Sequence, residues 1–156
     1  MTDSLHSVHT LFIDRNSGGK LFRDIVAAAG ISIVLHDEHF GTARPGERPP
    51  DDHDWLVQIG KQGWLIVTGD TRMIREPLFL RELPRSDAYV FLLHDLNGKT
   101  PQGKAECIID AFPKMIGLIE DADRPAVWLF KSGKVTAVNW LERLKKYSAW
   151  GRIPTD

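Results

Sequence analysis

The sequence predicts an α/β fold with a mainly parallel central sheet between two layers of helices, a three-layer α/β/α arrangement. Two observations predict it. Short, almost entirely apolar segments recur along the chain, and segments with apolar residues at helical spacing separate them. Apolar runs of this kind are typical of strands buried on both faces of a parallel sheet, and the helices between them form the crossover connections. A chain of 156 residues is the right length for one such domain, over 1–156.

The first expected elements form a strand-helix-strand unit. Residues 8–13 are an apolar run, and residues 31–35 form a second run rich in β-branched side chains. Between them, apolar residues recur at helical spacing over 21–29, and Gly30 stands where a helix would end. The unit should have the right-handed crossover of parallel strands.

The next part of the chain begins with a polar segment, 36–50, which contains glycine, proline and charged residues. It is long for a loop in a compact domain, which favours either a functional or a mobile segment. Asp51 is a suitable N-cap for a helix over 52–61, and residues 64–68 form the third expected strand.

Four further elements are expected before the last part of the chain: a short helix over 71–76, a helical turn over 78–83, a strand over 89–93 and a helix over 101–119. Proline should end the first two, at Pro77 and Pro84, and should kink or split the last at Pro113.

Residues 126–156 differ in character and are expected to extend the domain at its C-terminal end. Two short apolar runs, 126–130 and 135–138, flank a turn that contains Gly133, which predicts a β-hairpin. An amphipathic helix should follow, because apolar side chains recur at helical spacing at Trp140, Leu141, Leu144 and Tyr147.

Composition restricts the function classes. The formal net charge is −1, which argues against a high-affinity passive nucleic-acid binder and less against a nuclease, where metal ions supply positive charge. The single cysteine, Cys107, cannot form an internal disulfide and is expected in the core. Because no segment approaches the ~20 apolar residues of a membrane span, we expect no membrane association and a reducing cytoplasm.

Three aspartates fall at informative places. Asp14 ends the first expected strand, Asp70 ends the third, and Asp54 lies on the first turn of the helix that leads into the third strand. Ligand sites in open parallel sheets lie beyond the carboxyl ends of the strands, near a switch in strand order. The three carboxylates are therefore expected in one crevice, where hard oxygen ligands favour Mg²⁺ or Mn²⁺.

The chemistry that this placement predicts is metal-assisted hydrolysis of a phosphodiester bond. Asp14 and Asp70 would bind metal directly, and Asp54 would bind a second ion or orient the attacking water. Asn16 and Thr68 are candidates to hold these carboxylates by hydrogen bonds. Each aspartate taken singly has an ordinary interpretation, as a helix N-cap or as a solvated acid, so their combination carries the prediction.

Segments 11–16, 54–56 and 63–70 together resemble the PIN-like domain family: a strand ending in Asp14, a helix opening with Asp54, and a strand ending in Thr-Gly-Asp at Asp70. The similarity covers roughly the first 95 residues. It is closest to the bacterial branch that contains VapC-type toxins and their uncharacterised relatives.

The resemblance implies a metal-dependent ribonuclease that uses Mg²⁺ or Mn²⁺ at the same three aspartates, often with an antitoxin partner and often as a homodimer. The sequence departs from the family where many members have a further acid shortly after the Thr-x-Asp motif. Here Thr71, Arg72 and Met73 follow, which leaves a two-metal site open. Asp37, Glu38 and Asp87 are the acids considered as replacements.

Basic residues near the expected crevice have two interpretations. Arg15, Arg72 and Arg75, together with Lys20, are candidates to hold substrate phosphates, or they are ordinary surface charges. The histidines near the crevice show no zinc spacing and are expected on the surface; they are His36, His39 and His53.

The C-terminal segment interleaves aromatic with basic residues: Trp140, Tyr147 and Trp150 with Arg143, Lys145, Lys146 and Arg152. Such a pattern can clamp single-stranded nucleic acid. The favoured interpretation is a helix that packs its apolar side on the domain, and a dimer or antitoxin contact is a third.

The alternative to an enzyme is a degenerate α/β module that recognises protein or RNA without cleavage. The missing acid after Asp70 and the near-neutral charge favour it. A receiver-like phosphoacceptor is a weaker variant.

Overall fold

The computed structural model describes residues 9–14, 19–41 and 52–154, with the backbone alone for 52–54. Its six-stranded sheet has the order β2-β1-β3-β4-β5-β6. The strands are β1 (Thr10–Ile13), β2 (Ser32–Leu35), β3 (Leu65–Thr68), β4 (Tyr89–Leu93), β5 (Ala126–Lys131) and β6 (Lys134–Ala137). Each of the first five is parallel to its neighbours among them, and β6 pairs antiparallel with β5.

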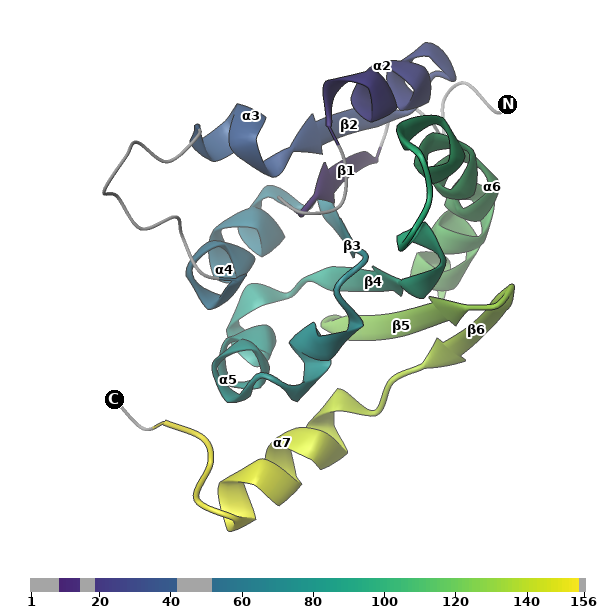
Figure 1. Cartoon of the computed structure of the whole chain (residues 1–156). Helices are drawn as coiled ribbons and strands as arrows, with labels where there is room; N and C mark the ends of the chain where they lie inside the picture. The colour runs from purple at the N-terminus through teal and green to yellow at the C-terminus, as the bar shows by residue number, and fades with distance from the viewer. Residues whose placement is uncertain (1–8, 15–18, 42–51, 155–156) are drawn as a thin grey trace.

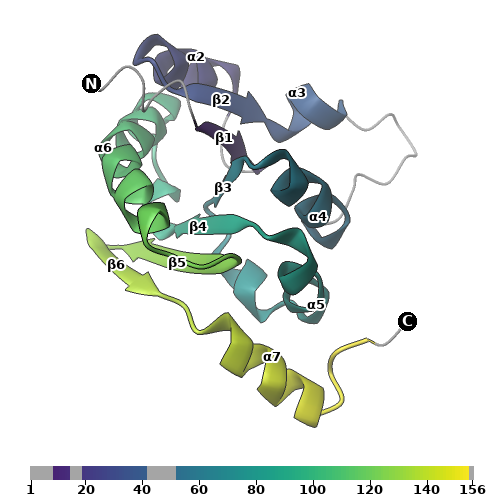
Figure 2. The ribbon, with the colours of Figure 1, turned by 180° about the vertical axis from the view of Figure 1, so that it is seen from behind.

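Helices cover both faces of this sheet (Figures 1 and 2). The α-helices are α2 (Lys20–Ala28), α3 (His36–Phe40), α4 (Asp52–Gln62), α5 (Pro77–Ser86), α6 (Pro101–Glu120) and α7 (Trp140–Ala149). Two 3₁₀ turns, η1 (Thr71–Arg75) and η2 (His94–Leu96), follow β3 and β4. Helices α2 and α6 pack on one face, and α4, α5 and α7 on the other. The predicted three-layer fold is confirmed.

Strand β4 shows why the strands are apolar on both sides. All five of its residues are buried. Tyr89 and Phe91 point into the core under α2 and α6, whereas Val90 and Leu92 point into the core under α4 and α5. Side chains alternate between the two faces of a strand, so a strand covered by helices on both faces has no polar side.

The strand order changes direction at β1, which lies between β2 and β3. Ile13 pairs with Leu35 on one side and with Val67 on the other. The chain therefore leaves β1 toward one edge of the sheet and later returns to the other side. The carboxyl ends of β1 and β3 thus form the switch point where ligand sites of such sheets usually lie.

The segment expected to be a loop over 36–50 is partly helical, because α3 forms at its start. Glu38 caps this short helix: its Oε1 accepts a hydrogen bond from the Leu35 backbone N–H (3.0 Å), and its other oxygen pairs with Arg23. The rest of the segment lies outside the described residues.

His36 was expected on the surface, and that prediction is wrong. Its side chain is 2% exposed, and its ring lies against the rings of Phe12, Phe40 and Trp55. The start of α3 folds this side chain over the sheet, and the sequence pattern alone did not place it there. Cys107, expected in the core, is only half-buried at the edge of the α2/α6 core.

Two prolines were expected to interrupt helices and do not. Helix α5 continues through Pro84 to Ser86, and α6 continues through Pro113. A helix that is packed along its length can lose one backbone hydrogen bond and remain continuous, since tertiary burial outweighs the local cost. The end of α5 is closed by the Ser86 hydroxyl, which donates to the Leu83 carbonyl (2.6 Å) and accepts from the Ala88 N–H (3.1 Å).

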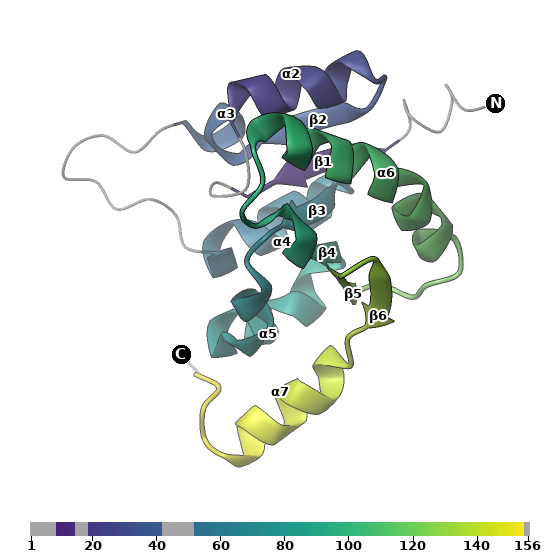
Figure 3. The ribbon, with the colours of Figure 1, turned by 45° about the vertical axis from the view of Figure 1, so that its right-hand side comes forward.

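The predicted C-terminal hairpin and helix are confirmed. Helix α7 follows β6, contacts α5, and lies at the far end of the molecule from α2 (Figure 3). The hairpin turn is attached to η2. Both carboxylate oxygens of Asp95 accept backbone hydrogen bonds, from Ser132 (2.7 Å) and Gly133 (3.2 Å). Among the helices of the described residues, none has the length and apolarity of a membrane span.

Candidate active site at the carboxyl edge of the sheet

Asp14 follows directly on β1, and its side chain is only 5% exposed. Its backbone N–H donates to the Val67 carbonyl (3.1 Å), which continues the β1–β3 pairing by one residue. Its carboxylate Oδ2 accepts a hydrogen bond from the hydroxyl of Thr68, the last residue of β3 (2.8 Å). No basic side chain in the described part of the chain forms an ion pair with Asp14.

Thr68 also contacts the loop that carries Asp70. Its Oγ1, fully buried, accepts a hydrogen bond from the Asp70 backbone N–H (3.0 Å). One hydroxyl therefore joins two of the three predicted metal ligands, because it donates to the side chain of Asp14 and accepts from the backbone N–H of Asp70. The expected role of Thr68 as a residue that holds these acids has this geometric support.

Asp70 itself is the N-cap of η1. Its Oδ1 accepts from the Arg72 backbone N–H (3.0 Å) and from the Arg72 Nε (3.2 Å). The carboxylate is about one-third exposed, and the Arg72 side chain is 82% exposed. The capping interpretation of Asp70 is thus confirmed, and the backbone of the same residue is linked to Asp14 through the Thr68 hydroxyl.

Asp54 lies on the first turn of α4, the helix that leads into β3. A helix that connects two parallel strands runs antiparallel to them, so the first turn of this helix lies at the carboxyl edge of the sheet. The side chain of Asp54 is outside the described residues, as are Arg15 and Asn16. Among the described side chains, no group of three or more His, Cys, Asp or Glu residues is arranged to hold a metal.

The basic residues proposed for phosphate contacts follow Asp70 in η1. Arg72 and Arg75 are both exposed, and Arg72 pairs with Asp70. Lys20 is exposed at the start of α2. Because η1 closely follows β3, both arginines come shortly after the carboxyl end of that strand.

Asn97 belongs to this edge, and the sequence reading overlooked it. Its Nδ2 donates to the Gly69 carbonyl (2.9 Å), so the loop after β4 holds the loop after β3. A Cβ at position 69 would lie 3.1 Å from Asn97 Oδ1, a tight contact that favours glycine. The sequence did contain a signal for Asn97: it follows the apolar run of β4, and polar residues that follow β4 lie at the same edge of the sheet as those that follow β1 and β3.

Three acids were considered as replacements for the acid that many family members have after the Thr-x-Asp motif, and the structure gives each of them another position or partner. Glu38 caps α3, and Asp37 pairs with His36 at 3.0 Å. Asp87 precedes β4, with a φ of 52°, and therefore lies at the opposite edge of the sheet from Asp14. The first two have these local partners, and Asp87 is excluded from the site by topology.

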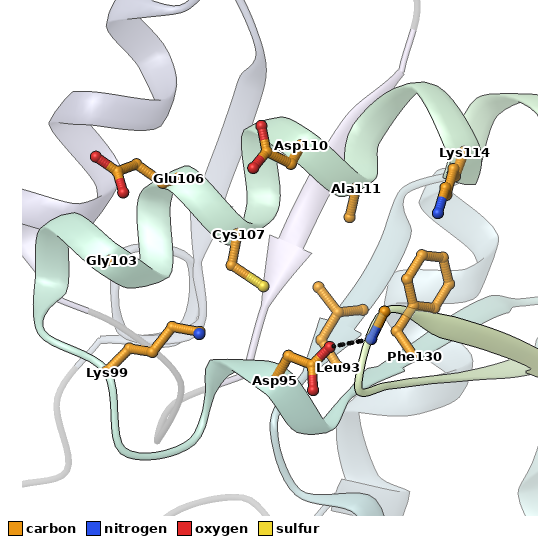
Figure 4. Close-up of a pocket in the computed structure, with 11 residues that line it drawn as sticks. Leu93, Asp95, Lys99, Gly103, Glu106, Cys107, Asp110, Ala111, Lys114 and Phe130 are labelled. Atoms are coloured by element: carbon orange, nitrogen blue, oxygen red, sulfur yellow. Dashed lines mark hydrogen bonds between the residues drawn. The ribbon is translucent and has the colours of Figure 1, made fainter.

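A separate cavity of about 400 Å³ opens between α6 and the β5–β6 turn (Figure 4). Asp95, Lys99 and Cys107 line it, and Asp14 and Asp70 do not. Burial raises the pKa of the Cys107 thiol, and the negative charges of Asp95 and Asp110 act in the same direction against the opposing effect of Lys99. A raised pKa favours the neutral thiol over the nucleophilic thiolate, so it gives no support for Cys107 as a nucleophile.

The fold and this edge define a doubly wound α/β domain with carboxylates at its switch point. A family model described as a PIN like domain matches residues 10–95, from β1 through η2, and the chain belongs to the PIN-like domain family. No curated protein and no solved structure matches the chain. The match ends where the sequence resemblance was expected to end, and it leaves α6, the β5–β6 hairpin and α7 outside.

Proposed function

We propose that this protein is a metal-dependent ribonuclease that hydrolyses phosphodiester bonds at the carboxyl edge of the sheet, with Asp14, Asp54 and Asp70 as its active centre. The observation that carries the proposal is the double hydrogen bond of the Thr68 hydroxyl, to the Asp14 carboxylate and from the Asp70 N–H. Membership of the PIN-like family supports nuclease chemistry at this edge.

The residues present fit a hard divalent cation. Asp14 offers a buried carboxylate, Asp70 a partly exposed one, and oxygen donors of this kind suit Mg²⁺ or Mn²⁺. A buried carboxylate charge is stabilised by hydrogen bonds or by a bound cation, and Asp14 has the hydrogen bond from Thr68. Asp14 and Asp70 would hold the ion, with Asp54 as the third ligand. The bound ion would polarise the phosphodiester and lower the pKa of a water.

The chain's own residues orient the reacting groups. Thr68 holds Oδ2 of Asp14 and so limits rotation of that carboxylate. Asn97 holds the Gly69 carbonyl and so limits movement of the loop that carries Asp70. Arg72 and Arg75, one helical turn apart at the same edge, are the candidates to hold substrate phosphates by charge-assisted hydrogen bonds.

From the resemblance to VapC-type toxins, we further propose that the protein is a cytoplasmic toxin. Its partner would be a small antitoxin protein, and its active form would be a homodimer. The near-neutral charge of the chain agrees with an enzyme that binds its substrate largely through metal and local arginines.

The test is a cleavage assay on structured and unstructured RNA with Mg²⁺, Mn²⁺ or EDTA, run beside Asp14→Asn, Asp54→Asn and Asp70→Asn proteins. We expect cleavage that needs metal and disappears in all three variants, while circular dichroism shows retained fold. Metal-independent cleavage, or full cleavage by Asp14→Asn, would contradict the proposed centre.

One observation favours the second candidate, a binding or regulatory module without catalysis. The Asp70 carboxylate already accepts hydrogen bonds from Arg72 N and Nε, as a structural cap would. That alternative predicts no cleavage and no change in thermal stability on adding Mg²⁺ or Mn²⁺. The enzyme hypothesis predicts cleavage and a rise in thermal stability on adding the metal.

A further inference from the structure

A groove of about 580 Å³ lies between α7 and the β5–β6 hairpin, outside the part of the chain that the family model matches. Leu129 and Val138 contribute apolar contacts at the hairpin side. The α7 side and the residues after it contribute Arg143, Lys146, Tyr147, Trp150 and Arg152. Figures 1 and 3 show α7 following on from the end of β6 after a short loop, on the side of the molecule where α5 lies.

Two aromatic side chains of this groove lie next to each other, with their ring planes tilted by 37°. The Tyr147 and Trp150 ring centroids lie 5.8 Å apart. The Arg152 guanidinium lies over both rings, 5.8 Å from the Tyr147 centroid and 5.3 Å from that of Trp150. Trp150 is nevertheless 61% exposed, a large apolar surface left in water.

Packing of α7 explains its other aromatic residues but not Trp150. Trp140, Leu144 and Tyr147 are partly buried against the core under α4 and α5, and the Trp140 Nε1 donates to the Pro125 carbonyl (3.2 Å). Trp150 stands one helical turn beyond Tyr147 and is not part of that core. An amphipathic helix that only packs on its domain does not need this exposed ring.

The groove is also positively charged. Its lining contains three basic residues, Arg143, Lys146 and Arg152, and one acid, Glu142. Glu142 is engaged locally, because its N–H bonds to the Asn139 side chain (3.1 Å) and its carboxylate pairs with Lys146 (3.4 Å). A chain with a net charge of −1 thus concentrates cations here beside an exposed indole.

We propose that this groove binds single-stranded RNA, with a base stacked on Trp150 and the phosphates held by Arg143 and Arg152. The inference rests on the proposed function in taking RNA as the ligand. The groove would be a second binding surface for the RNA substrate, located on the C-terminal extension and separate from the three aspartates. Stacking on aromatic rings combined with a basic surface is the usual chemistry of single-strand binding. An acidic peptide would satisfy the cations but gives no specific use for the exposed indole.

The experiment is fluorescence anisotropy of an end-labelled single-stranded RNA of about 12 nucleotides, titrated with the full chain in EDTA so that no cleavage occurs. We expect Trp150→Ala and Arg152→Ala each to weaken binding, on the order of 10-fold for loss of one stacked base. Trp150→Phe should retain most of the affinity because it keeps a stacking ring. Matched controls on the same helix are Leu141→Ala and Lys145→Ala, which remove an exposed apolar and an exposed basic side chain outside the groove.

The outcomes separate this site from the active centre. Weaker binding in Trp150→Ala and Arg152→Ala, with unchanged binding in both controls, supports the groove whether or not the protein cleaves RNA. Equal losses in Lys145→Ala, or equal affinity for duplex RNA of the same length, would mean nonspecific attraction and would overturn it. Stronger binding of polyglutamate than of the RNA would assign the groove to an acidic protein and also overturn it.

Discussion

The hydroxyl of Thr68 donates a 2.8 Å hydrogen bond to Oδ2 of Asp14, from the neighbouring strand and across 54 positions of sequence. Both side chains are buried, and the same hydroxyl accepts the Asp70 N–H. The arrangement links two strand ends and orients one carboxylate. A substitution of Thr68 would therefore change how the carboxylate of Asp14 is oriented while leaving both aspartates in the protein.

Replacement of Thr68 by valine should lower cleavage by about 10- to 100-fold, as loss of a hydrogen bond that orients a ligand typically does. It should also destabilise the fold by about 1–3 kcal/mol, because a buried carboxylate and a buried N–H lose their partner. Thr68→Ser keeps the hydroxyl and should retain most of the activity. Cleavage rates and urea unfolding measure the two effects, and equal activity in valine and serine variants would contradict the role.

Replacement of Asp14 by asparagine should abolish cleavage but leave the metal-free protein as stable as the parent or more stable. The substitution removes a buried negative charge, and the asparagine Oδ1 can still accept from Thr68. In thermal unfolding, Mg²⁺ or Mn²⁺ should raise the Tm of the parent and not that of the variant, since a ligand that binds only the folded state stabilises it. The same metal-dependent rise in both proteins would show that Asp14 does not bind the ion.

Asp95 should make the stability of the C-terminal hairpin dependent on pH. Hydrogen bonds from the Ser132 N–H, and then from the Gly133 N–H, lower the pKa of this carboxyl below its ordinary value of 3.8, against an opposing effect of desolvation. Since the folded-state pKa lies below the unfolded one, the stabilisation is present above the ordinary value and is lost as pH falls through the folded-state pKa.

Urea unfolding at about pH 7 and below about pH 4 measures this contribution. Asp95→Asn should lower stability at the higher pH and converge with the parent in acid. Asp123→Asn is the control, because the Asp123 carboxylate makes neither of these hydrogen bonds. A difference between Asp95→Asn and the parent that stays constant over the whole range would exclude this linkage.

Gly60 permits the close approach of α4 and α5. A Cβ there would lie 2.1 Å from the backbone oxygen of Ser86, a contact that no side-chain rotation can relieve. Gly60→Ala should therefore destabilise the protein by about 1–3 kcal/mol, the usual cost of overpacking. Gly117→Ala is the matched control: its helix α6 leaves open space around the new methyl, so it should stabilise by about 0.4–1 kcal/mol. Chemical denaturation of both variants compares them, and a neutral Gly60→Ala would contradict the packing.

Most of the fold could be predicted from local patterns. The apolar runs identified all six strands, and Gly30, with a φ of 88°, stands just past α2 as expected. Prolines misled the prediction at Pro84 and Pro113, because the local cost of proline in a helix is outweighed by burial that depends on distant residues. His36 was misplaced for the same reason, since its burial depends on rings from β1 and α4.

The sequence by itself determined the order along the chain of the strands and of the helices other than α3. It also determined the parallel character of the sheet and the placement of Asp14 and Asp70 at strand ends, because these depend on periodicity within short segments. Only the tertiary structure decided which groups meet. Thr68 joins two acids, Asn97 holds the Gly69 carbonyl, and Asp95 anchors the hairpin turn. These contacts link strands and loops far apart in sequence, so they exist only once the sheet has paired its strands in order.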